Sequence, residues 1–430
     1  MNPTTAYSRR VFIRQGALLA SFAATLPHFL QESAMGMLLP EGSAAGSQPG
    51  VPDERILVVV QLSGGNDGLN TVIPYGDAEY HNARPGIGLG EPGKPKNGGA
   101  ALELDQARGI GLHPNLTGLK ELHDAGSLCV VAGVGYPNPN RSHFASMDIW
   151  QSGRPEGKGT GWLGRYVDAA CNGSPAADMA IAVGRTAPLA MTGATSAPIA
   201  FESADLFRWL GADKNGAMDK EYQQLVRAGS LPGVEPGSQE SFLMRTALDA
   251  QVTSDRIRAA VAKKPLVTYP GSQLSKQLQT VAAMIRDGMK TRVYYVSMGG
   301  FDTHANQPGG HGNLMRQLGD ALLAFQKDLQ QQGNDGRVVT MCFSEFGRRV
   351  RQNASNGTDH GTAGPMFLIG PRVNPGLQGT YPSLTDLDGG DLKFTTDFRG
   401  VYQELLGKWM GADTKAVLGG EWTAPGLVRA

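Results

Sequence analysis

The sequence predicts an α/β protein built on a mostly parallel sheet. Several runs have the apolar or β-branched character and the length of buried strands: 56–62, 128–134, 291–298, 338–343 and 366–369. Helix-length segments and long connections separate most of these runs, and parallel strands require such crossovers. Acidic or histidine residues follow several of the runs, at the strand ends where open α/β sheets bind ligands. We therefore expect a polar site at the carboxyl edge of the sheet.

The composition is that of a globular protein. Hydrophobic residues make up 40% of the 430 residues, charged residues make up 18%, and the formal net charge is zero. A nucleic-acid partner is not expected, because binding to phosphates requires a basic face. Cys129, Cys171 and Cys342 are widely spaced and form no CxxC motif, which excludes an iron–sulfur cluster or a zinc finger and leaves at most one disulfide.

The N-terminus resembles an export signal. Ser8, Arg9 and Arg10 precede an apolar segment, 16–29, that is shorter than the roughly 20 residues needed to cross a bilayer. This order predicts a twin-arginine signal peptide over 1–35 and a Gly-, Ser- and Pro-rich linker over 36–54. The alternative is a chance basic pair before a buried helix. We expect export through the twin-arginine translocase to the periplasm or cell exterior, with no membrane span in the mature chain.

Residues 55–430 are predicted to form the α/β domain. Amphipathic patterns and capping residues predict helices over 114–126, 142–150, 272–288, 311–332 and 396–410. The pattern changes over 185–265, where 187–201 has the character of a short hairpin, and the segments after 203 and over 239–263 are partly amphipathic. We expect 185–265 to be a helical and hairpin insertion that caps the site outside the sheet.

The acids and histidines near the predicted strand ends are candidate metal ligands. Two residues apart, Asp302 and His304 directly follow a strand and can ligate one ion. The whole set offers oxygen and nitrogen donors, which suit one or two ions of zinc, manganese, calcium or magnesium. The alternative for each residue is a helix cap or a solvated loop position. The candidate metal ligands are Asp67, Asp302, His304, Glu345, Asp359 and His360.

A second group of candidates lies at the start of the helix predicted near 142. Ser142 and His143 open this helix with free backbone amides, which suits an anion such as phosphate or sulfate, and Arg141 provides a counter-charge. The alternative is that Ser142 only caps the helix. His143 and His311 are additional candidate metal ligands.

Five motifs, in this order, carry a family resemblance: SGGNDGLNT, NRSHFASMDIWQSG, GGFDTHANQ, SEFGRR and TDHGTAGPMFLIG. With the export signal, they resemble the bacterial domain-of-unknown-function 1501 family over nearly the whole mature chain. That family is in turn similar to the alkaline phosphatase and sulfatase superfamily. The resemblance implies a three-layer sandwich, in which helices flank a central mixed sheet, with a dinuclear metal site at the carboxyl edge of the sheet.

The resemblance also suggests roles for individual residues. Asp67 resembles the metal-binding acid after the first strand, Asp302 and His304 the pair on one metal, and His360 the late histidine. The chain departs from the superfamily pattern at Glu345, which stands with Phe346 where an Asp-His pair is usual. It also has Asn-Pro-Asn at 138–140 near the position of the nucleophile, so that Ser142 is the nearest hydroxyl.

Two functions follow from these observations. The first is an exported metal-dependent hydrolase of phosphate or sulfate esters, acting on a small molecule or a glycan. In this hypothesis Ser142 or a metal-bound oxygen attacks, Arg348 or Arg141 steadies the anion, and Asp359 orients His360. The alternative is a catalytically inactive family member that binds a glycan or a protein partner at the cell envelope.

Overall fold

The computed structural model describes residues 55–171, 177–204 and 253–429. Its central sheet has nine strands in these residues, eight of them in the order β11-β5-β10-β9-β1-β8-β6-β7, and β14 pairs with β5. Strand β10 is antiparallel to β5 and β9, and the other pairs are parallel. The prediction of a mostly parallel sheet is confirmed. The strands are β1 (Ile56–Leu62), β5 (Leu128–Gly135), β6 (Ala180–Val183), β7 (Ile199–Phe201), β8 (Val293–Met298), β9 (Val338–Ser344), β10 (Gly364–Ile369), β11 (Gly376–Gln378) and β14 (Thr396–Asp397).

Strand β1 lies near the middle of the sheet because its side chains are apolar on both faces. Its register places Leu57 beside Val293 of β8 on one side and beside Val339 of β9 on the other. These three residues are fully buried. A strand covered on both faces has no solvent side, which explains why its sequence is apolar except for Gln61.

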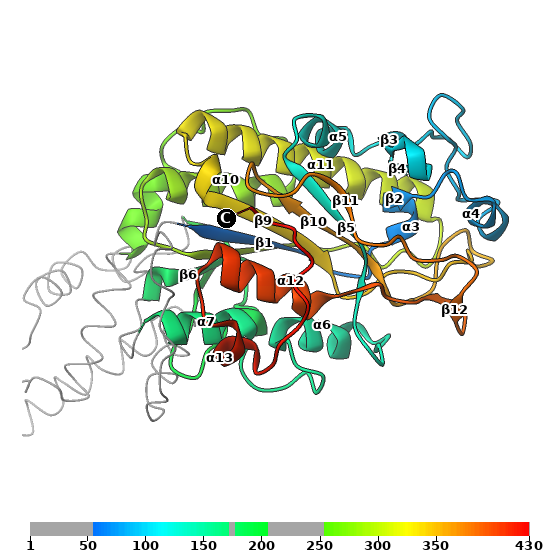
Figure 1. Ribbon diagram of the computed structural model, residues 1–430. Coiled ribbons are helices and arrows are strands. Elements are labelled where there is room, and N and C mark those ends of the chain that lie inside the picture. The colour runs from blue at the N-terminus through cyan, green and yellow to red at the C-terminus, as the bar shows by residue number, and fades with distance from the viewer. Residues whose placement is uncertain (1–54, 172–176, 205–252, 430) are drawn as a thin grey trace, which may run out of the picture.

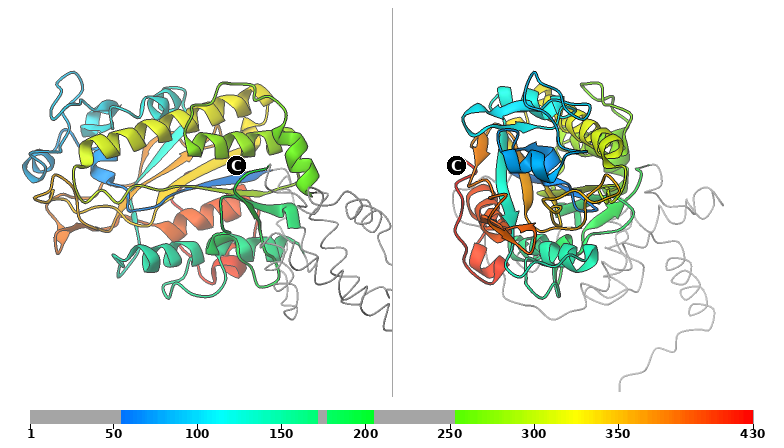
Figure 2. Two further views of the ribbon diagram at one scale, coloured as in Figure 1. Left: turned by 180° about the vertical axis from the view of Figure 1, so that it is seen from behind. Right: turned by 90° about the vertical axis from the view of Figure 1, so that its right-hand side faces the viewer.

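Helices cover both faces of the sheet and complete a three-layer structure (Figure 1). Helices α5 (Thr117–Asp124), α10 (Gln273–Arg286) and α11 (Gln307–Gln332) lie on one face. Helices α6 (His143–Ser152), α7 (Trp162–Ala170), α12 (Phe398–Glu404) and α13 (Thr414–Leu418) lie on the other, as the view from behind confirms (Figure 2). Each face has its own apolar core, since alternate side chains of β1 such as Val58 and Val59 belong to different clusters.

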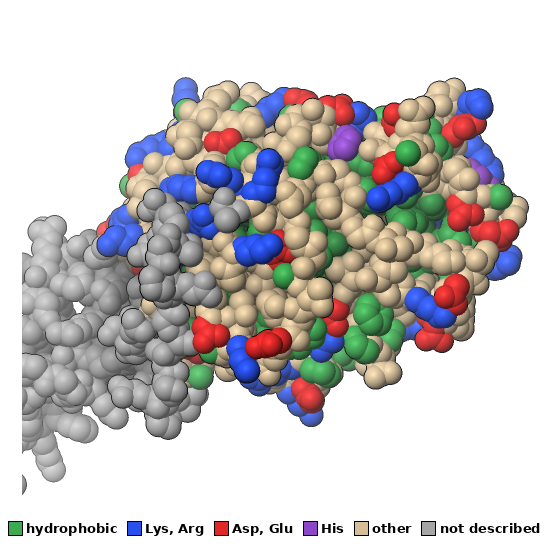
Figure 3. Space-filling model, in the orientation of Figure 1, with side chains coloured by type: hydrophobic (Ala, Val, Ile, Leu, Met, Phe, Trp, Pro, Cys, Tyr) green, Lys and Arg blue, Asp and Glu red, His purple; other side chains and the backbone are tan. Residues whose placement is uncertain are grey.

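Smaller elements surround the sheet. They are α3 (Gly68–Thr71), β2 (Val72–Ile73), α4 (Ala78–Ala83), β3 (Leu102–Asp105), β4 (Ile110–Leu112), β12 (Leu387–Asp388), β13 (Asp391–Leu392) and short helical turns including Leu189–Met191. On the face drawn in Figure 3, acidic and basic side chains both occur, with several basic ones gathered at the upper left. This surface is consistent with a chain of zero net charge.

Two sequence predictions about local structure are wrong. Residues 187–201 do not form a hairpin, because β7 pairs in parallel with β6 and extends the central sheet, so this part of the predicted cap belongs to the sheet. Both strands are short and apolar, and the burial of most of their side chains stabilises them in the sheet. The closing helix predicted over 396–410 is divided into β14, α12 and a π-helical turn, Leu405–Trp409.

Other sequence predictions lie outside the described residues. They are the signal peptide over 1–35, the linker over 36–54 and most of the cap over 185–265. The described part of that cap includes β7 and a helical segment over 253–261. Among the residues that the structure describes, no helix has both the length and the apolar character of a membrane span.

A buried carboxylate fixes the C-terminal segment to α12. Glu404 is almost completely buried, and its two oxygens accept hydrogen bonds from the backbone amides of Gly426, Leu427 and Val428 at 2.6, 2.6 and 3.0 Å. Lys408 donates a further bond at 3.2 Å. Hydrogen bonds from buried amides to a carboxylate are stronger than those to a neutral acceptor.

We expect Glu404→Ala to destabilise the fold by about 3 kcal/mol, because it leaves buried amides without an acceptor. Urea unfolding followed by circular dichroism measures this change. Glu421→Ala is the matched control, since Glu421 is exposed and meets only Lys415 at 3.6 Å, and it should change stability by less than about 0.5 kcal/mol. Equal effects of the two substitutions would contradict the anchoring role.

Candidate metal centre

The site lies where four chain segments meet at the carboxyl edge of the sheet. Asp302 and His304 follow the end of β8, and Glu345 follows the end of β9. His360 precedes β10, whose antiparallel direction brings its start to the edge where its parallel neighbours end. His143 is the first residue of α6, after β5 has ended at the same edge.

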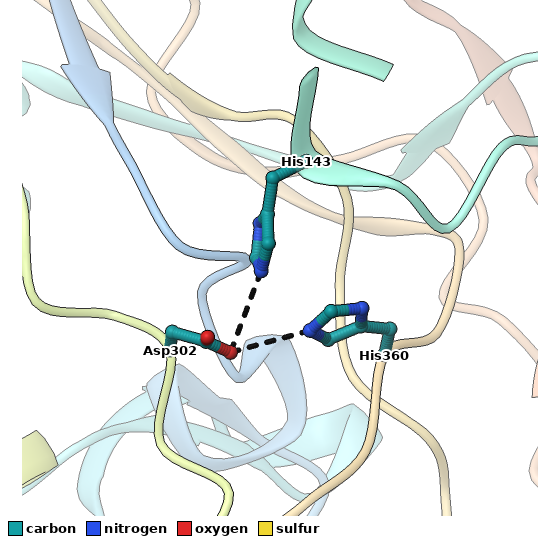
Figure 4. A group of neighbouring side chains, drawn as sticks. All are labelled: His143, Asp302 and His360. Carbon is teal, nitrogen blue, oxygen red and sulfur yellow. Dashed lines mark hydrogen bonds and ion pairs between the residues drawn. The ribbon is translucent and has the colours of Figure 1, made fainter. Parts of the chain in front are cut away.

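Three imidazole nitrogens converge on one carboxylate oxygen. Asp302 Oδ1 lies 3.0 Å from His304 Nε2, 3.2 Å from His360 Nε2 and 3.4 Å from His143 Nε2. The Nε2 atoms of His304 and His360 are themselves only 2.9 Å apart. Figure 4 shows that His143 and His360 approach Asp302 from different segments of the chain. We call these four residues, His143, Asp302, His304 and His360, the histidine cluster.

The other ring nitrogen of each histidine faces an acceptor outside the cluster. His143 Nδ1 lies 2.8 Å from Glu345 Oε1, and His360 Nδ1 lies 2.8 Å from the carbonyl oxygen of Arg141. His304 Nδ1 lies 3.4 Å from Asp359 Oδ1. Carboxylate and carbonyl oxygens only accept, so each Nδ1 carries a proton, and in this tautomer of the neutral ring each Nε2 lone pair is directed into the cluster.

This arrangement fits a bound cation. Two Nε2 lone pairs at 2.9 Å repel each other unless a proton or a metal ion lies between them. His143 Nε2 is buried and makes no hydrogen bond within the described part of the chain. Outer acceptors that fix the tautomer of each histidine are also the usual surroundings of metal-binding imidazoles. The cluster therefore has both the donors and the supporting contacts of a metal site.

The donor set indicates which ions fit. Three imidazole nitrogens and one carboxylate oxygen suit zinc and other first-row transition metals such as manganese, whereas calcium and magnesium take oxygen ligands. Burial alone would raise the pKa of Asp302, but the hydrogen bond and the charge of Arg348 outweigh it and bring that pKa to about 2. The carboxylate is therefore ionised at neutral pH and available to a cation.

Arg348 supports the cluster from beneath. Its side chain has no exposed surface, and its N–H groups donate to the carbonyl oxygens of Gly64, Gly65, Phe301 and Thr358 at 2.5 to 3.2 Å. Its Nη2 also lies 2.6 Å from Asp302 Oδ1. The sequence predicted that Arg348 steadies a substrate anion, but these bonds occupy its donors and assign it to holding the loops of the site together.

Asp67 lies in a separate buried network instead of the cluster. Its Oδ2 accepts from Arg84 Nη1 at 2.6 Å and from Gln307 Nε2 at 2.5 Å. Both partners of the Asp67–Arg84 ion pair are fully buried. Burial raises the pKa of Asp67, yet the charge of Arg84 outweighs it and lowers that pKa below the usual value. His311, another candidate ligand, belongs to this network, since its Nε2 lies 3.3 Å from Asn66 Oδ1.

The structure thus sorts the six predicted ligands into three groups. Asp302, His304 and His360 converge as expected. Glu345 and Asp359 lie one layer out, where each faces an Nδ1 of the cluster; Asp359 was expected to orient His360 but faces His304 instead. Glu345 is nearly fully buried, and it also accepts from the backbone amide of Gly64 at 2.8 Å. Asp67 lies outside both layers.

The helix start at 142 lies beside the cluster. Arg141 holds His360 through its carbonyl oxygen, while its guanidinium pairs with Asp391. Ser142 is exposed at the N-cap of α6, and its side chain makes no capping hydrogen bond. The charge of Arg141 is already matched by a carboxylate, so the hydroxyl of Ser142 is the less constrained of the two groups.

His143 is the candidate ligand that sequence reasoning ranked too low. Its signal was present, since it opens a helix directly after a strand and a polar loop, as Asp302 follows β8. The sequence did not show that the loop returns the helix start to the same edge of the sheet. Phe346, which stands where a second histidine was expected, packs its ring 4.9 Å from that of His143 and 5.0 Å from that of His360.

A family model described as "Protein of unknown function (DUF1501)" matches residues 54–387. The chain belongs to the DUF1501 family. A search of curated proteins finds no significant match to this DUF1501 protein. Its fold is similar to that of several solved structures, including the following two.

The first of these structures is Ps i-CgsB in complex with k-i-k-neocarrahexaose, with 9% identity, a TM-score of 0.34, and coverage of 86% of this chain and 72% of the other. The second is the PsFucS1 sulfatase from Pseudoalteromonas sp., with 10% identity, a TM-score of 0.33, and coverage of 84% and 70%.

Two buried histidines near Asp67 make the DUF1501 protein sensitive to acid. Burial lowers the pKa of His113 to about 3 and that of His311 to about 4, whereas an unfolded histidine titrates near 6.5. Below about pH 6.5 the unfolded chain binds more protons than the folded one, so stability falls as the pH falls. Each histidine should remove about 2 kcal/mol between pH 7.5 and pH 5.

Urea unfolding at the two pH values, with chelator present, measures this loss. His113→Asn removes one titrating group, so its stability should fall about 2 kcal/mol less than that of the wild type over the same range. Asp67 does not interfere, because a carboxyl with a lowered pKa loses its contribution only below about pH 4. An unchanged pH dependence in the variant would contradict the assignment.

Proposed function

We propose that this DUF1501 protein is an exported, metal-dependent hydrolase of phosphate or sulfate esters. The observation that supports the proposal best is the convergence of the three Nε2 atoms and Asp302, with every Nδ1 facing an acceptor. A structural role alone does not require three imidazole lone pairs to face one carboxylate. The proposal of export, through the twin-arginine translocase to the periplasm or cell exterior, rests on the sequence around Arg9 and Arg10.

The residues of the cluster have distinct tasks in this proposal. His143, Asp302, His304 and His360 would hold a zinc or manganese ion, and such an ion polarises an ester oxygen and lowers the pKa of water. Glu345 keeps the Nδ1 proton on His143, and the carbonyl of Arg141 does so for His360.

The substrate would meet the exposed side of this cluster. About half of the Asp302 side chain is exposed, which leaves the cluster open on one side. Ser142, exposed at the start of α6, or a water molecule is then the group that attacks the ester.

One observation favours the alternative, a non-catalytic protein that binds a glycan. Phe144 follows His143 directly and is 86% exposed, the most exposed large hydrophobic side chain in the described residues. Exposed aromatic faces stack on apolar groups, and sugar rings present such groups. A glycan that binds equally well with and without chelator, and that is not hydrolysed, would favour this alternative.

The decisive experiment on the proposal is the metal content of the protein recovered after export, by elemental mass spectrometry. The wild type should retain zinc or manganese, and Asp302→Ala should lose it because the shared carboxylate is gone. Asp388→Ala, which removes an exposed acid on β12, is the control and should retain the metal. A metal-free wild-type protein would contradict the proposal, whereas a metal-loaded one would justify a screen of aryl phosphates and aryl sulfates.

The acceptors that face the Nδ1 atoms should strengthen metal binding, and a buried acceptor close to its histidine should do so more than an exposed and distant one. We expect Glu345→Gln to weaken metal binding by about 10- to 100-fold, because Glu345 is buried 2.8 Å from His143 Nδ1. Asp359→Asn should have a smaller effect, since Asp359 is exposed and lies 3.4 Å from His304. Competition with a chromogenic chelator measures both affinities. Equal losses of metal affinity in the two variants, or no loss in either, would contradict the supporting role of these acceptors.

A further inference from the structure

The resemblance to the alkaline phosphatase and sulfatase superfamily implied two metal ions, and a second ion requires donors beyond the histidine cluster. The remaining candidates among the predicted ligands are Asp67, Glu345 and Asp359. Glu345 is committed to His143, to the backbone amide of Gly64 and to the hydroxyl of Ser344 at 2.9 Å. Asp359 accepts from Asn353 Nδ2 at 3.1 Å, besides facing His304.

An arginine already lies beside each of the two acids that resemble metal ligands. At Asp302 it is Arg348, whose Nη2 lies 2.6 Å from the oxygen that the three histidines surround. At Asp67 it is Arg84, whose Nη1 lies 2.6 Å from Oδ2. The side chains of both arginines are completely buried. A guanidinium cannot be deprotonated in a protein, so both positive charges are permanent.

Both arginines are fixed in place by hydrogen bonds to other groups. Arg348 donates to four backbone carbonyls from three loops of the site. Arg84 donates to the carbonyls of Arg349 and Val350 at 2.9 Å and to Asn70 Oδ1 at 2.9 Å. Displacement would leave these buried acceptors without donors, and a divalent ion at Asp67 Oδ2 would be repelled by the fixed guanidinium of Arg84.

A bridge of polar groups separates Asp67 from the cluster. Gln307 donates to Asp67 through Nε2, and its Oε1 accepts from Thr358 Oγ1 at 2.7 Å. The carbonyl oxygen of Thr358 accepts in turn from Arg348 Nη1 at 2.8 Å. The two acids are therefore linked through neutral groups and Arg348, with no shared ligand between them.

We infer that the site takes one divalent ion, at the histidine cluster, and that Arg348 and Arg84 supply the positive charge that a second ion provides in a two-metal hydrolase. The inference rests on the proposed function for the first ion. It explains why Glu345 is followed by Phe346 instead of a histidine, since a second set of ligands is not needed at this position. The ion pairs of Arg348 with Asp302 and of Arg84 with Asp67 hold both carboxylates in place without metal.

Metal stoichiometry tests this inference on the whole wild-type protein. The protein is loaded with excess zinc or, separately, manganese, freed of weakly bound ions by gel filtration, and analysed by elemental mass spectrometry. One equivalent per chain is expected. Two equivalents would overturn the inference and leave the proposed function standing, whereas none would overturn the proposed function itself.

A matched pair of acid-to-amide variants locates the ion. Asp67→Asn should keep one equivalent, because Asp67 holds Arg84 and not the metal, whereas Asp302→Asn should lose it. Loss of metal from a folded Asp67→Asn protein would contradict the inference. X-ray absorption of the wild-type holoprotein gives an independent answer even where a variant does not fold. The spectrum should lack metal–metal scattering at about 3.5–4 Å, and its presence would show a dinuclear site.

Discussion

The site depends on the charge of one buried arginine. Arg348 donates hydrogen bonds to carbonyl oxygens of the loop after β1, the segment after β8 and the loop before β10. It also forms an ion pair with Asp302. Loops at the edge of a sheet have backbone groups that no ladder satisfies, and these groups need donors when they are buried. The planar fork of a guanidinium can serve several of them at once, which the single ammonium of a lysine cannot match. The histidines converge because the loops that carry them are fixed in this way.

Much of the fold could be predicted because the central strands are apolar on both faces. The runs at β1, β5, β9 and most of β10 are almost entirely apolar, and their only polar side chains are Gln61 in β1 and Thr340 and Ser344 in β9. Strand β6 was not recognised and β7 was assigned to a hairpin, because they are only four and three residues long and a short apolar segment is common in loops as well. The direction of β10 could not be predicted, since a strand has the same alternation when it is read either way. That direction places His360 at the site.

The site could be predicted only as far as its ligands follow strands. Asp302 and His304 follow β8 directly, so their place at the carboxyl edge was fixed by the local sequence. The role of Asp67 depended on Arg84, whose guanidinium has no signature in the sequence around it. Glu345 was placed correctly, yet its task was not, because only the folded chain shows that His143 lies between Glu345 and Asp302. Strand ends thus predict where a polar residue lies, and long-range contacts decide what it binds.

The sequence distance between the ligands has a consequence for how the protein is made. His143 is separated from Asp302 by much of the chain, and β1 pairs with β9 across nearly 300 positions, so the cluster does not exist until these distant parts have come together. Contacts of such high sequence separation form late, after the entropy of closing long loops has been lost. An ion bound at the cluster would therefore not act as a nucleus for folding in the way that zinc does for a zinc finger, and its capture would follow the completed fold.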